Sequence, residues 1–442
     1  MKAKVLPGPL AGSLTILPSK SHLHRLLICA ALADKETFIS SAPTEAEDVA
    51  ATMACLTALG ATIRPYSLPR EGCPEGAGWC PPTEGWLITP IDHNNLPTHA
   101  VLPCRESGST FRFMLPLVCA LGVSGEFHMA GRLPERPLAP LDEELTRQGI
   151  TLTRPEPKIL CTEGKLQAGD FLLPGNVSSQ YITGLLMALP LLTGDSTLTV
   201  EGRVESADYI HMTREATAAF GRTPTLIENR YEIQGGGQYQ SPGTVNSEGD
   251  WSNAAFWLCA GAMPGGNIAL QGLDPQSRQG DKALVDILAK MGAKITWTDS
   301  VVTVQEGTRS ALQIDAAAIP DLIPVLSAVA AVSRGYTVIK NAARLRLKES
   351  DRLAATATVL NTLGAKIQET PDGLKIEGVP FLTGGTVDAW GDHRIAMMAA
   401  IASTACKHPV TITGAEAVRK SYPQFWQELA ALGKEVHLIE NL

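Results

Sequence analysis

The stretches AKMGAKITW (residues 289–297) and NTLGAKIQE (residues 361–369) share one pattern, in which an apolar helical run stops at a glycine and a short β-like run follows. Glycine closes a helix in the left-handed conformation at little cost, and the chain can then leave as a strand. The pattern occurs six times. Its glycines are Gly60, Gly149, Gly221, Gly292, Gly364 and Gly433, at intervals of 89, 72, 71, 72 and 69 residues. A helix–glycine–strand unit therefore recurs about every 71 residues, which indicates a repeat architecture.

The first interval is long because it contains RPYSLPREGCPEGAGWCPPTEGW, residues 64–86. The density of proline and glycine in this stretch is typical of an irregular insertion. Without the insertion, the first interval matches the others.

A second landmark precedes each of these glycines by about 42 residues, in the pattern of a polar cluster before an apolar helical run. The six landmarks centre on Lys20, Ser107, Ser178, Asp250, Asp321 and Asp392. Serine, aspartate and glycine at such positions are typical of helix N-caps. Each unit is therefore predicted to follow the order βαβαββ, and six units in two groups of three predict two similar α/β domains.

The glycine- and proline-rich stretch QGGGQYQSPG, residues 234–243, is predicted to carry the chain between the domains. We expect one domain over residues 18–242 and the other over residues 1–17 and 243–442. Equivalent helix N-termini would then face a cleft between the domains, and helix N-termini bind anions.

The net charge and the length of the apolar runs disfavour nucleic-acid-binding and membrane proteins. The chain has 442 residues, a formal net charge of −8 and 44% hydrophobic residues. An acidic balance disfavours general attraction to nucleic acid or to an anionic membrane. The longest apolar runs, about twelve residues, are shorter than the ~20 residues of a membrane-spanning helix. No signal peptide is evident, so a cytoplasmic protein is expected, and the nine scattered cysteines are expected to be reduced.

Cations at the helix starts oppose this acidic balance. Lys20 and Arg25 flank the first predicted helix start, where the helix dipole disfavours positive charge. His22 and His24 lie beside them, but no carboxylate is near enough in sequence to favour a metal site. The residue pattern allows a solvated helix start, and it also allows a site for a ligand that carries phosphate or carboxylate groups.

The densest charged cluster is ARLRLKESDRL, residues 343–353. Lys348 and Arg352 flank Glu349, which fits either a surface ion-pair network or a catalytic acid beside a doubly charged ligand. Asp321 is open to a similar pair of interpretations, as a helix cap or as a proton acceptor.

Eight ordered motifs, SKSHLHR, ESGSTFR, GRLPERP, VSSQYITGLLMALPL, EGDWSNAAFWLCAGA, LKESDRL, GDHRIAMMAA and RKSYPQFW, extend over nearly the whole chain. Together they resemble the 3-phosphoshikimate 1-carboxyvinyltransferase (5-enolpyruvylshikimate-3-phosphate synthase) family. The resemblance implies the enolpyruvyl transferase fold of two domains with three βαβαββ units each. It also implies transfer of a carboxyvinyl group from phosphoenolpyruvate to the 5-hydroxyl of shikimate 3-phosphate, without a metal or organic cofactor.

The family's functional residues carry over onto matching positions of this sequence. The resemblance implies that shikimate 3-phosphate is bound by Ser21, Arg25, Ser178, Ser179, Gln180, Ser206, Asp321 and Lys348. It implies that phosphoenolpyruvate is bound by Lys20, Gly108, Ser109, Arg132, Gln180, Arg352, Arg394 and Lys420. The implied catalytic groups are Asp321, Glu349 and Lys20. The implied partners are these two small substrates, with no nucleic acid, no membrane and a monomeric state.

Four positions depart from the family pattern. Ser19 follows Pro18 directly, where the family usually has an intervening glycine. Ser109 replaces a frequent threonine, and Glu106 and Arg344 stand where asparagine is common.

Two alternatives remain. A sister family transfers the same group to a UDP-sugar, UDP-N-acetylglucosamine, but it carries Lys-Asn where Ser21 follows Lys20 here. A non-catalytic phosphate-binding repeat protein would fit the cations, but it would have no need of Asp321 and Glu349 among them.

Overall fold

In the computed structural model, residues 1–42, 44–67 and 84–440 are described. Contacts divide the chain into two compact units. We call residues 18–248 the continuous unit, and residues 1–17 together with 249–442 the split unit. Each unit has its own hydrophobic core.

The six βαβαββ repeats are confirmed as six four-stranded sheets in the described parts of the chain, three in each unit. Every sheet has the same plan, in which one outer pair of strands is parallel and the remaining neighbours are antiparallel. The predicted α/β fold is therefore observed with its internal symmetry.

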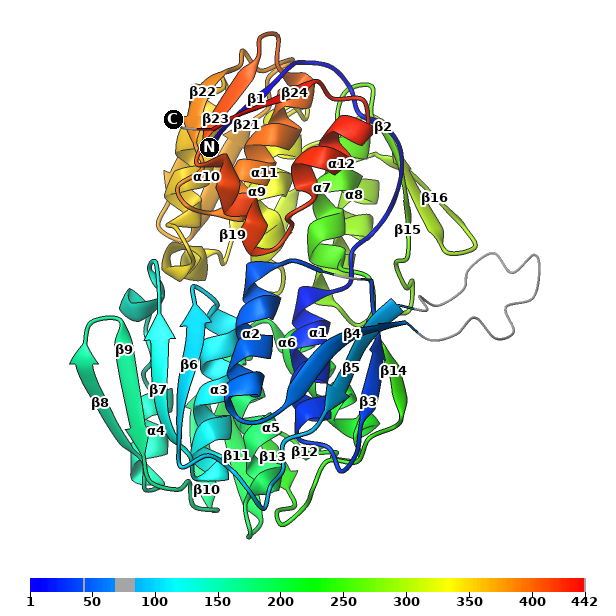
Figure 1. The fold of residues 1–442 in the computed structure, drawn as a ribbon. Coiled ribbons are helices and arrows are strands. Elements are labelled where there is room, and N and C mark those ends of the chain that lie inside the picture. Colours follow the sequence, from blue (N-terminus) through cyan, green and yellow to red (C-terminus); the bar gives the residue numbers. More distant parts are fainter. Residues whose placement is uncertain (43, 68–83, 441–442) are drawn as a thin grey trace. The chain divides into compact units, whose positions relative to one another are not determined.

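The continuous unit is drawn in blue to green in Figure 1. Its sheets have the strand orders β14-β3-β5-β4, β6-β7-β9-β8 and β10-β11-β13-β12. The strands are β3 Thr37–Ser40, β4 Thr62–Ser67, β5 Glu84–Thr89, β6 His99–Arg105, β7 Ser124–Met129, β8 Thr151–Glu156, β9 Ile159–Glu163, β10 Asp170–Pro174, β11 Ser196–Glu201, β12 Thr225–Ile227, β13 Arg230–Ile233 and β14 Thr244–Asn246. The helices are α1 Lys20–Ala31, α2 Glu47–Ala58, α3 Gly108–Leu121, α4 Leu141–Arg147, α5 Ser179–Ala188 and α6 Ala207–Ala219, with short 3-10 turns η1 Leu133–Glu135 and η2 Leu189–Leu191.

The split unit has the strand orders β16-β17-β15-β2, β18-β19-β21-β20 and β22-β23-β1-β24. Its strands are β1 Lys2–Val5, β2 Ala11–Thr15, β15 Asn267–Gln271, β16 Lys294–Thr298, β17 Val301–Gln305, β18 Gln313–Asp315, β19 Tyr336–Lys340, β20 Lys366–Thr370, β21 Gly373–Glu377, β22 Gly385–Asp388, β23 Val410–Thr413 and β24 Val436–Ile439. Its helices are α7 Trp251–Ala262, α8 Leu284–Lys290, α9 Ile323–Ala331, α10 Arg352–Thr362, α11 His393–Ala402 and α12 Phe425–Ala431, with 3-10 turns η3 Gly280–Ala283, η4 Pro320–Leu322, η5 Ala343–Leu347, η6 Ser403–Ala405 and η7 Ala415–Lys420.

Three sheets borrow a strand from a distant part of the chain. β14 completes the sheet of β3, β2 completes the sheet of β15, and β1 lies between β23 and β24. Figure 1 shows this last arrangement as the dark blue β1 among orange and red strands.

The chain passes to the split unit after Glu248, later than the expected boundary at residue 242. Two contacts explain the difference. Tyr239 is buried in the continuous unit, where its hydroxyl donates to the Met187 carbonyl oxygen at 2.9 Å, and β14 then pairs with β3. The predicted linker is therefore part of the continuous unit.

The six repeat glycines do what the sequence predicts. Their φ angles are all positive, between 74° at Gly221 and 106° at Gly60. In each case the following residue donates its backbone N–H to the carbonyl five positions earlier, as Ala61 does to Leu56 and Lys434 to Leu429. This bond defines the Schellman motif, so all six helices end in the same way.

Five of the six predicted helix starts are side-chain N-caps. The capping residues are Ser19, Ser107, Ser178, Asp250 and Asp392, each accepting a bond from a backbone N–H two or three positions ahead. The prediction is wrong at Asp321, which lies in η4 and makes no cap bond. Its carboxylate is instead used in ion pairs described below.

Two further expectations concern irregular regions. The ends of the insertion, residues 64–67 and 84–86, are strand residues of the β4–β5 hairpin, and residues 68–83 lie outside the described residues. The seven cysteines in the described ranges are free thiols, and all but Cys161 are buried. Within those ranges no helix combines the length and the apolar character needed to cross a membrane.

Candidate functional site

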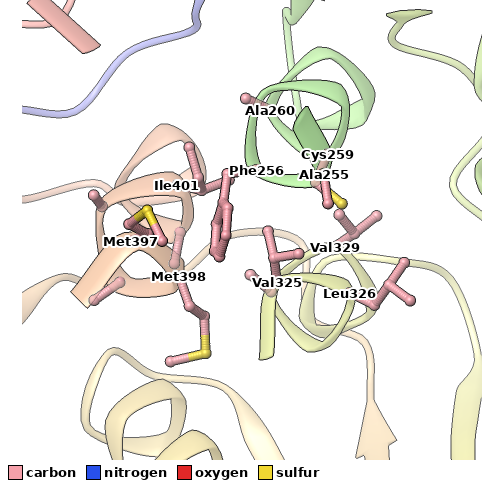
Figure 2. Close-up of a cluster of buried hydrophobic side chains, with 14 of the residues drawn as sticks. Ala255, Phe256, Cys259, Ala260, Val325, Leu326, Val329, Met397, Met398 and Ile401 are labelled. Carbon is pink, nitrogen blue, oxygen red and sulfur yellow. The ribbon is translucent and has the colours of Figure 1, made fainter. Parts of the chain in front are cut away.

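The core helices of the split unit determine where its charged residues lie. α7, α9 and α11 pack against one another, and Phe256 of α7 points between α9 and α11 toward Val325 and Met398 (Figure 2). All three side chains are fully buried. This packing places Arg394, at the start of α11, within hydrogen-bond distance of Ser252 at the start of α7 and of Asp321 just before α9.

Arg352, at the start of α10, is the centre of a cluster of charges. Its Nε donates to Asp392 at 2.7 Å, Nη1 to Asp321 at 2.8 Å and Nη2 to Glu349 at 2.7 Å. The Arg352 side chain is 1% exposed and that of Asp392 is 0% exposed. A buried guanidinium requires such pairing, because an unpaired buried charge is strongly unfavourable.

The other carboxylates of the cluster are more accessible, since the side chains of Asp321 and Glu349 are 18% and 17% exposed. Lys348 lies 3.6 Å from Asp321, and Lys420 lies 3.7 Å from Glu349. The cluster therefore has a buried interior, formed by Arg352 and Asp392. It also has a solvent-accessible edge, where two carboxylates and two lysines meet. We call these residues, together with Arg394, the Arg352 cluster.

The environment of Asp321 keeps its carboxyl ionised. Burial alone would raise its pKa, but Arg394, Lys348 and Arg352 outweigh burial and hold the pKa well below its usual range. Lys348 shows the opposite balance, because burial outweighs the attraction of Asp321 and lowers its pKa to about 8.

In the continuous unit, Lys20 opens α1 directly after its cap Ser19. Its ammonium lies 2.7 Å from a carboxylate oxygen of Asp48, in the first turn of α2. This pairing explains why a lysine is tolerated at a helix N-terminus, because a neighbouring helix supplies the opposite charge. Ser19 has a φ of −63°, which a residue other than glycine adopts freely. The chain therefore enters α1 at Ser19 without a left-handed turn that would require glycine.

Arg25 is buried among neutral oxygen atoms. Nε donates to Thr213 Oγ1 at 2.8 Å, Nη1 donates to the Ser21 carbonyl oxygen at 2.6 Å, and Nη2 donates to Thr183 Oγ1 and to the Tyr209 carbonyl oxygen. Burial lowers its pKa to about 10. Four of its five N–H groups are used within the described residues, which leaves one at Nη1.

The N-termini of α3 and α5 are joined by Gln180. Its Nε2 donates to Ser109 Oγ at 2.9 Å, and its Oε1 accepts from Arg112 Nη1 at 3.0 Å. Gly108 opens α3 beside two guanidinium groups, since a Cβ at this position would lie 2.7 Å from Arg136 Nη1 and 2.8 Å from Arg112 Nη1. The absence of a side chain at residue 108 therefore allows both arginines to approach the helix start.

Three serines lie at the start of α5 and α6. Ser178 caps α5, Ser179 is the first residue of that helix, and Ser206 precedes α6 with a φ of 55°. Ser206 makes no cap bond, although serine favours that use. A non-glycine residue in the left-handed region is strained, and such strain is concentrated at functional sites.

The structure brings the predicted residues together in two groups, one in each unit. Asp321, Lys348, Glu349, Arg352, Arg394 and Lys420 form the Arg352 cluster. In the continuous unit, Gly108, Ser109 and Gln180 are neighbours. Arg132 is half-exposed and forms an ion pair with Glu135 at 3.7 Å, while Arg136, its neighbour in the proline-flanked loop, approaches Gly108.

Sequence reasoning missed Asp48, Ser252 and Asp281. Asp48 is one of two acids in the first turn of α2, which signals only a favourable helix dipole. Ser252 lies two residues after the cap Asp250, so its position signalled only a helix start. Asp281 lies in a 3-10 turn, which has no helical sequence pattern. No group of three or more His, Cys, Asp or Glu residues in the described ranges is arranged to hold a metal ion. His24 instead shares a hydrogen bond with Thr52 Oγ1.

Solved structures with this fold identify its class. EPSP synthase from Acinetobacter baumannii aligns with a TM-score of 0.77 at 25% identity, over 99% of this chain and 100% of that one. The enolpyruvyl transferase NikO from Streptomyces tendae aligns with a TM-score of 0.76 at 18% identity, over 99% of this chain and 98% of that one, which supports the fold alone. The chain therefore has the fold of the enolpyruvyl transferases.

The family is shown by sequence. The family model described as EPSP synthase (3-phosphoshikimate 1-carboxyvinyltransferase) matches residues 6–429, and the chain belongs to that family. A relative named 3-phosphoshikimate 1-carboxyvinyltransferase from Clostridium beijerinckii is 43% identical, and the match covers 97% of each chain. A relative with the same name from Clostridium acetobutylicum is 42% identical, and that match covers 98% of each chain.

Proposed function

We propose that this chain transfers the carboxyvinyl group of phosphoenolpyruvate to the 5-hydroxyl of shikimate 3-phosphate and releases phosphate. Family membership supports this reaction. The observation that carries the mechanism is the accessible edge of the Arg352 cluster, where Asp321 and Glu349 lie beside Lys348 and Lys420.

The reaction needs proton transfer at two atoms. The attacking hydroxyl loses a proton while the methylene carbon of phosphoenolpyruvate gains one, and a tetrahedral ketal forms. Elimination then removes a proton from the new methyl group and expels phosphate, which regenerates the vinyl group. We assign Asp321 and Lys348 to the hydroxyl, and Glu349 to the carbon, because two separate carboxylates allow the two transfers to proceed at once.

Substrate binding supplies a means of activating Asp321. Arg352 and Arg394 are assigned to the carboxylate of phosphoenolpyruvate, and both also contact Asp321. A substrate carboxylate that competes for these guanidinium groups would weaken their hold on Asp321 and raise its pKa toward the range of a useful base. Asp321 would thus become a better base only when phosphoenolpyruvate is present.

The continuous unit supplies the remaining groups. Lys20, Arg132, Gly108 and Ser109 are assigned to the phosphate of phosphoenolpyruvate, with Lys420 from the split unit. Ser178, Ser179 and Ser206 are assigned to the 3-phosphate of shikimate 3-phosphate, and Ser21, Arg25 and Gln180 to its ring. Helix N-termini and cations both favour phosphate, which supports these assignments. The monomeric state and the cytoplasmic location stay predictions.

Phosphate release from phosphoenolpyruvate tests the reaction, with shikimate 3-phosphate and UDP-N-acetylglucosamine as alternative acceptors. We expect release only with shikimate 3-phosphate, together with a carboxyvinyl product detectable by mass. Release with the UDP-sugar alone would contradict the proposal. Binding of both small substrates without release would favour a non-catalytic phosphate-binding protein.

A further inference from the structure

His24 is a fully buried histidine of α1 to which the proposed chemistry gives no role. Its ring Nδ1 lies 2.7 Å from Thr52 Oγ1 in α2. Thr52 Oγ1 in turn lies 2.7 Å from Thr110 Oγ1 in α3, and both threonines are fully buried. Three side chains from three helices therefore form one continuous run of hydrogen bonds inside the continuous unit. We call His24, Thr52 and Thr110 the His24 chain.

The His24 chain ends at two helix starts. Thr110 Oγ1 contacts two further oxygen atoms, Ser107 Oγ at 2.7 Å and the Asp48 carbonyl oxygen at 3.2 Å. Ser107 caps α3 directly before Gly108. The Asp48 side chain lies in the first turn of α2 and pairs with Lys20 at 2.7 Å. Thr110 therefore connects the start of α3 to the residue that holds the Lys20 ammonium.

A count of protons gives the chain a direction. A threonine hydroxyl has one proton, and Thr110 shares its proton between Ser107 Oγ and the Asp48 carbonyl oxygen. Thr110 must therefore accept from Thr52, which uses the single proton of that hydroxyl as well. The remaining contact then requires His24 to donate from Nδ1 to Thr52.

The second ring nitrogen of His24 agrees with this direction. Nε2 is buried and has no hydrogen-bond partner among the described residues. A proton on Nε2 would thus be a buried donor without an acceptor, which is costly. Burial also lowers the pKa of His24 to about 3, so the ring is neutral near pH 7 and carries a single N–H. His24 is therefore a neutral donor with its proton on Nδ1.

We infer that the His24 chain has a positioning role, in which it fixes the start of α3 relative to Lys20 so that both can bind one phosphate group. This inference rests on the proposed function, which assigns Lys20, Gly108 and Ser109 to the phosphate of phosphoenolpyruvate. These groups lie on two helices, α1 and α3, so their spacing depends on what joins the helices. An error of about 1 Å in such spacing costs up to ~10²-fold in activity.

Thr110→Val tests the role with the full chain. Valine has nearly the shape of threonine but removes the hydroxyl, which breaks the contacts to Thr52, Ser107 and Asp48. We expect the KM for phosphoenolpyruvate to rise about tenfold while kcat changes less. Thr110→Ser keeps the hydroxyl, so its KM should stay near that of the unmodified chain.

Thr217→Val is the matched control. Thr217 is also fully buried in the continuous unit, but its hydroxyl donates to the Arg214 carbonyl oxygen at 3.1 Å, within its own helix α6. The control loses one buried hydroxyl, as Thr110→Val does, and should change neither KM nor kcat. A loss of stability common to both variants therefore cannot account for a KM that rises only in Thr110→Val.

The tautomer of His24 gives a readout that does not depend on activity. Nitrogen-15 chemical shifts of selectively labelled histidine, measured near pH 7, should show a protonated Nδ1 and an unprotonated Nε2 for this residue. The signal is assigned by its loss in His24→Asn. That variant keeps an N–H near the Nδ1 position and should keep a KM near that of the unmodified chain, whereas His24→Leu removes the donor and should raise the KM about tenfold.

The inference is overturned if Thr110→Val matches Thr217→Val in KM, if Thr110→Ser loses as much as Thr110→Val, or if His24 carries its proton on Nε2. If Thr110→Val does not fold, the comparison of His24→Leu with His24→Asn decides in its place, and equal KM values for those two would overturn the inference. If the unmodified chain releases no phosphate, the proposed function fails, and that result is distinct from an active chain whose variants show no effect.

Discussion

Arg352, the first residue of α10, and Arg25, in the second turn of α1, are both buried guanidinium groups, one in each unit, but they are held in opposite ways. Arg352 has three carboxylate partners, Asp321, Glu349 and Asp392, and although burial opposes it, their attraction raises its pKa. Arg25 has hydroxyl and carbonyl partners within the described residues, and burial lowers its pKa.

The difference lies in the source of the negative charge. Around Arg352 the protein supplies it, while the side chains of Asp321 and Glu349 stay partly exposed. Around Arg25 no carboxylate is among the hydrogen-bond partners found in the described residues, which agrees with its proposed role in binding an anionic ligand. The following experiments test this contrast between charged and neutral pairing.

The largest effect is expected for Asp392→Ala, which leaves Arg352 buried without one of its carboxylate partners. We expect a loss of about 3–5 kcal/mol in the free energy of unfolding of the split unit. Urea denaturation followed by tryptophan fluorescence is suitable, because five of the seven tryptophans lie in residues 249–442. Asp351→Ala is the control, since Asp351 also caps a helix but pairs with Arg346 at the surface, and its loss should be about 1 kcal/mol.

The matching change in the continuous unit is Thr213→Val, which removes a neutral acceptor from Arg25. Its expected cost is smaller, about 1–3 kcal/mol. Urea denaturation followed by circular dichroism measures it. Equal losses for Asp392→Ala and Thr213→Val would contradict the distinction between charged and neutral pairing.

The next largest effects concern catalysis. Glu349→Gln removes a carboxylate of the accessible edge, and Lys20→Met removes a cation of the continuous unit. Each is expected to lower kcat by at least ~10²-fold in a folded chain. Glu369→Gln, which removes a surface partner of Arg346, is the control. Activity that survives both changes would contradict the assigned roles.

Gly108→Ala should act through the arginines beside it. The added Cβ would force Arg112 and Arg136 away from the start of α3. We expect the KM for phosphoenolpyruvate to rise about tenfold, while stability holds because alanine is the better helix former. Steady-state kinetics and thermal melting measure the two quantities. A normal KM would show that the arginines move without functional cost.

The smallest effect tests what the units share. Gly60 and Gly433 close equivalent helices, and an added Cβ would meet nothing within 4 Å at either one. Alanine at each should therefore cost only the strain of a positive φ, about 1 kcal/mol. Unfolding free energies that differ widely between Gly60→Ala and Gly433→Ala would argue against equivalence of the repeats.

The repeat was the most predictable part of the molecule. Helix-closing glycines and N-cap residues act through local geometry, so their spacing revealed all six units before any contact was known. The pairing of β1 and β2 was not predictable in the same way, because these strands form their hydrogen bonds with residues more than 200 positions away.

The candidate site was predictable where a residue broke the local rule. Asp321 was expected to cap a helix or accept a proton, and in the structure it pairs with cations. Lys20 lies at a helix start that disfavours a positive charge. Their partners were harder to foresee. Asp48 looks like an ordinary surface acid in sequence, and its pairing with Lys20 depends on which helices pack together.

The placement of β1 between β23 and β24 has a consequence for synthesis on the ribosome. Residues 18–248 contain every strand and helix of the continuous unit, so that unit is complete soon after its last residue emerges. β1 is made first, yet its neighbours β23 and β24 are made last. The nascent chain must therefore keep this strand unpaired for nearly the whole of translation, a period in which chaperone binding would protect it from pairing with other chains.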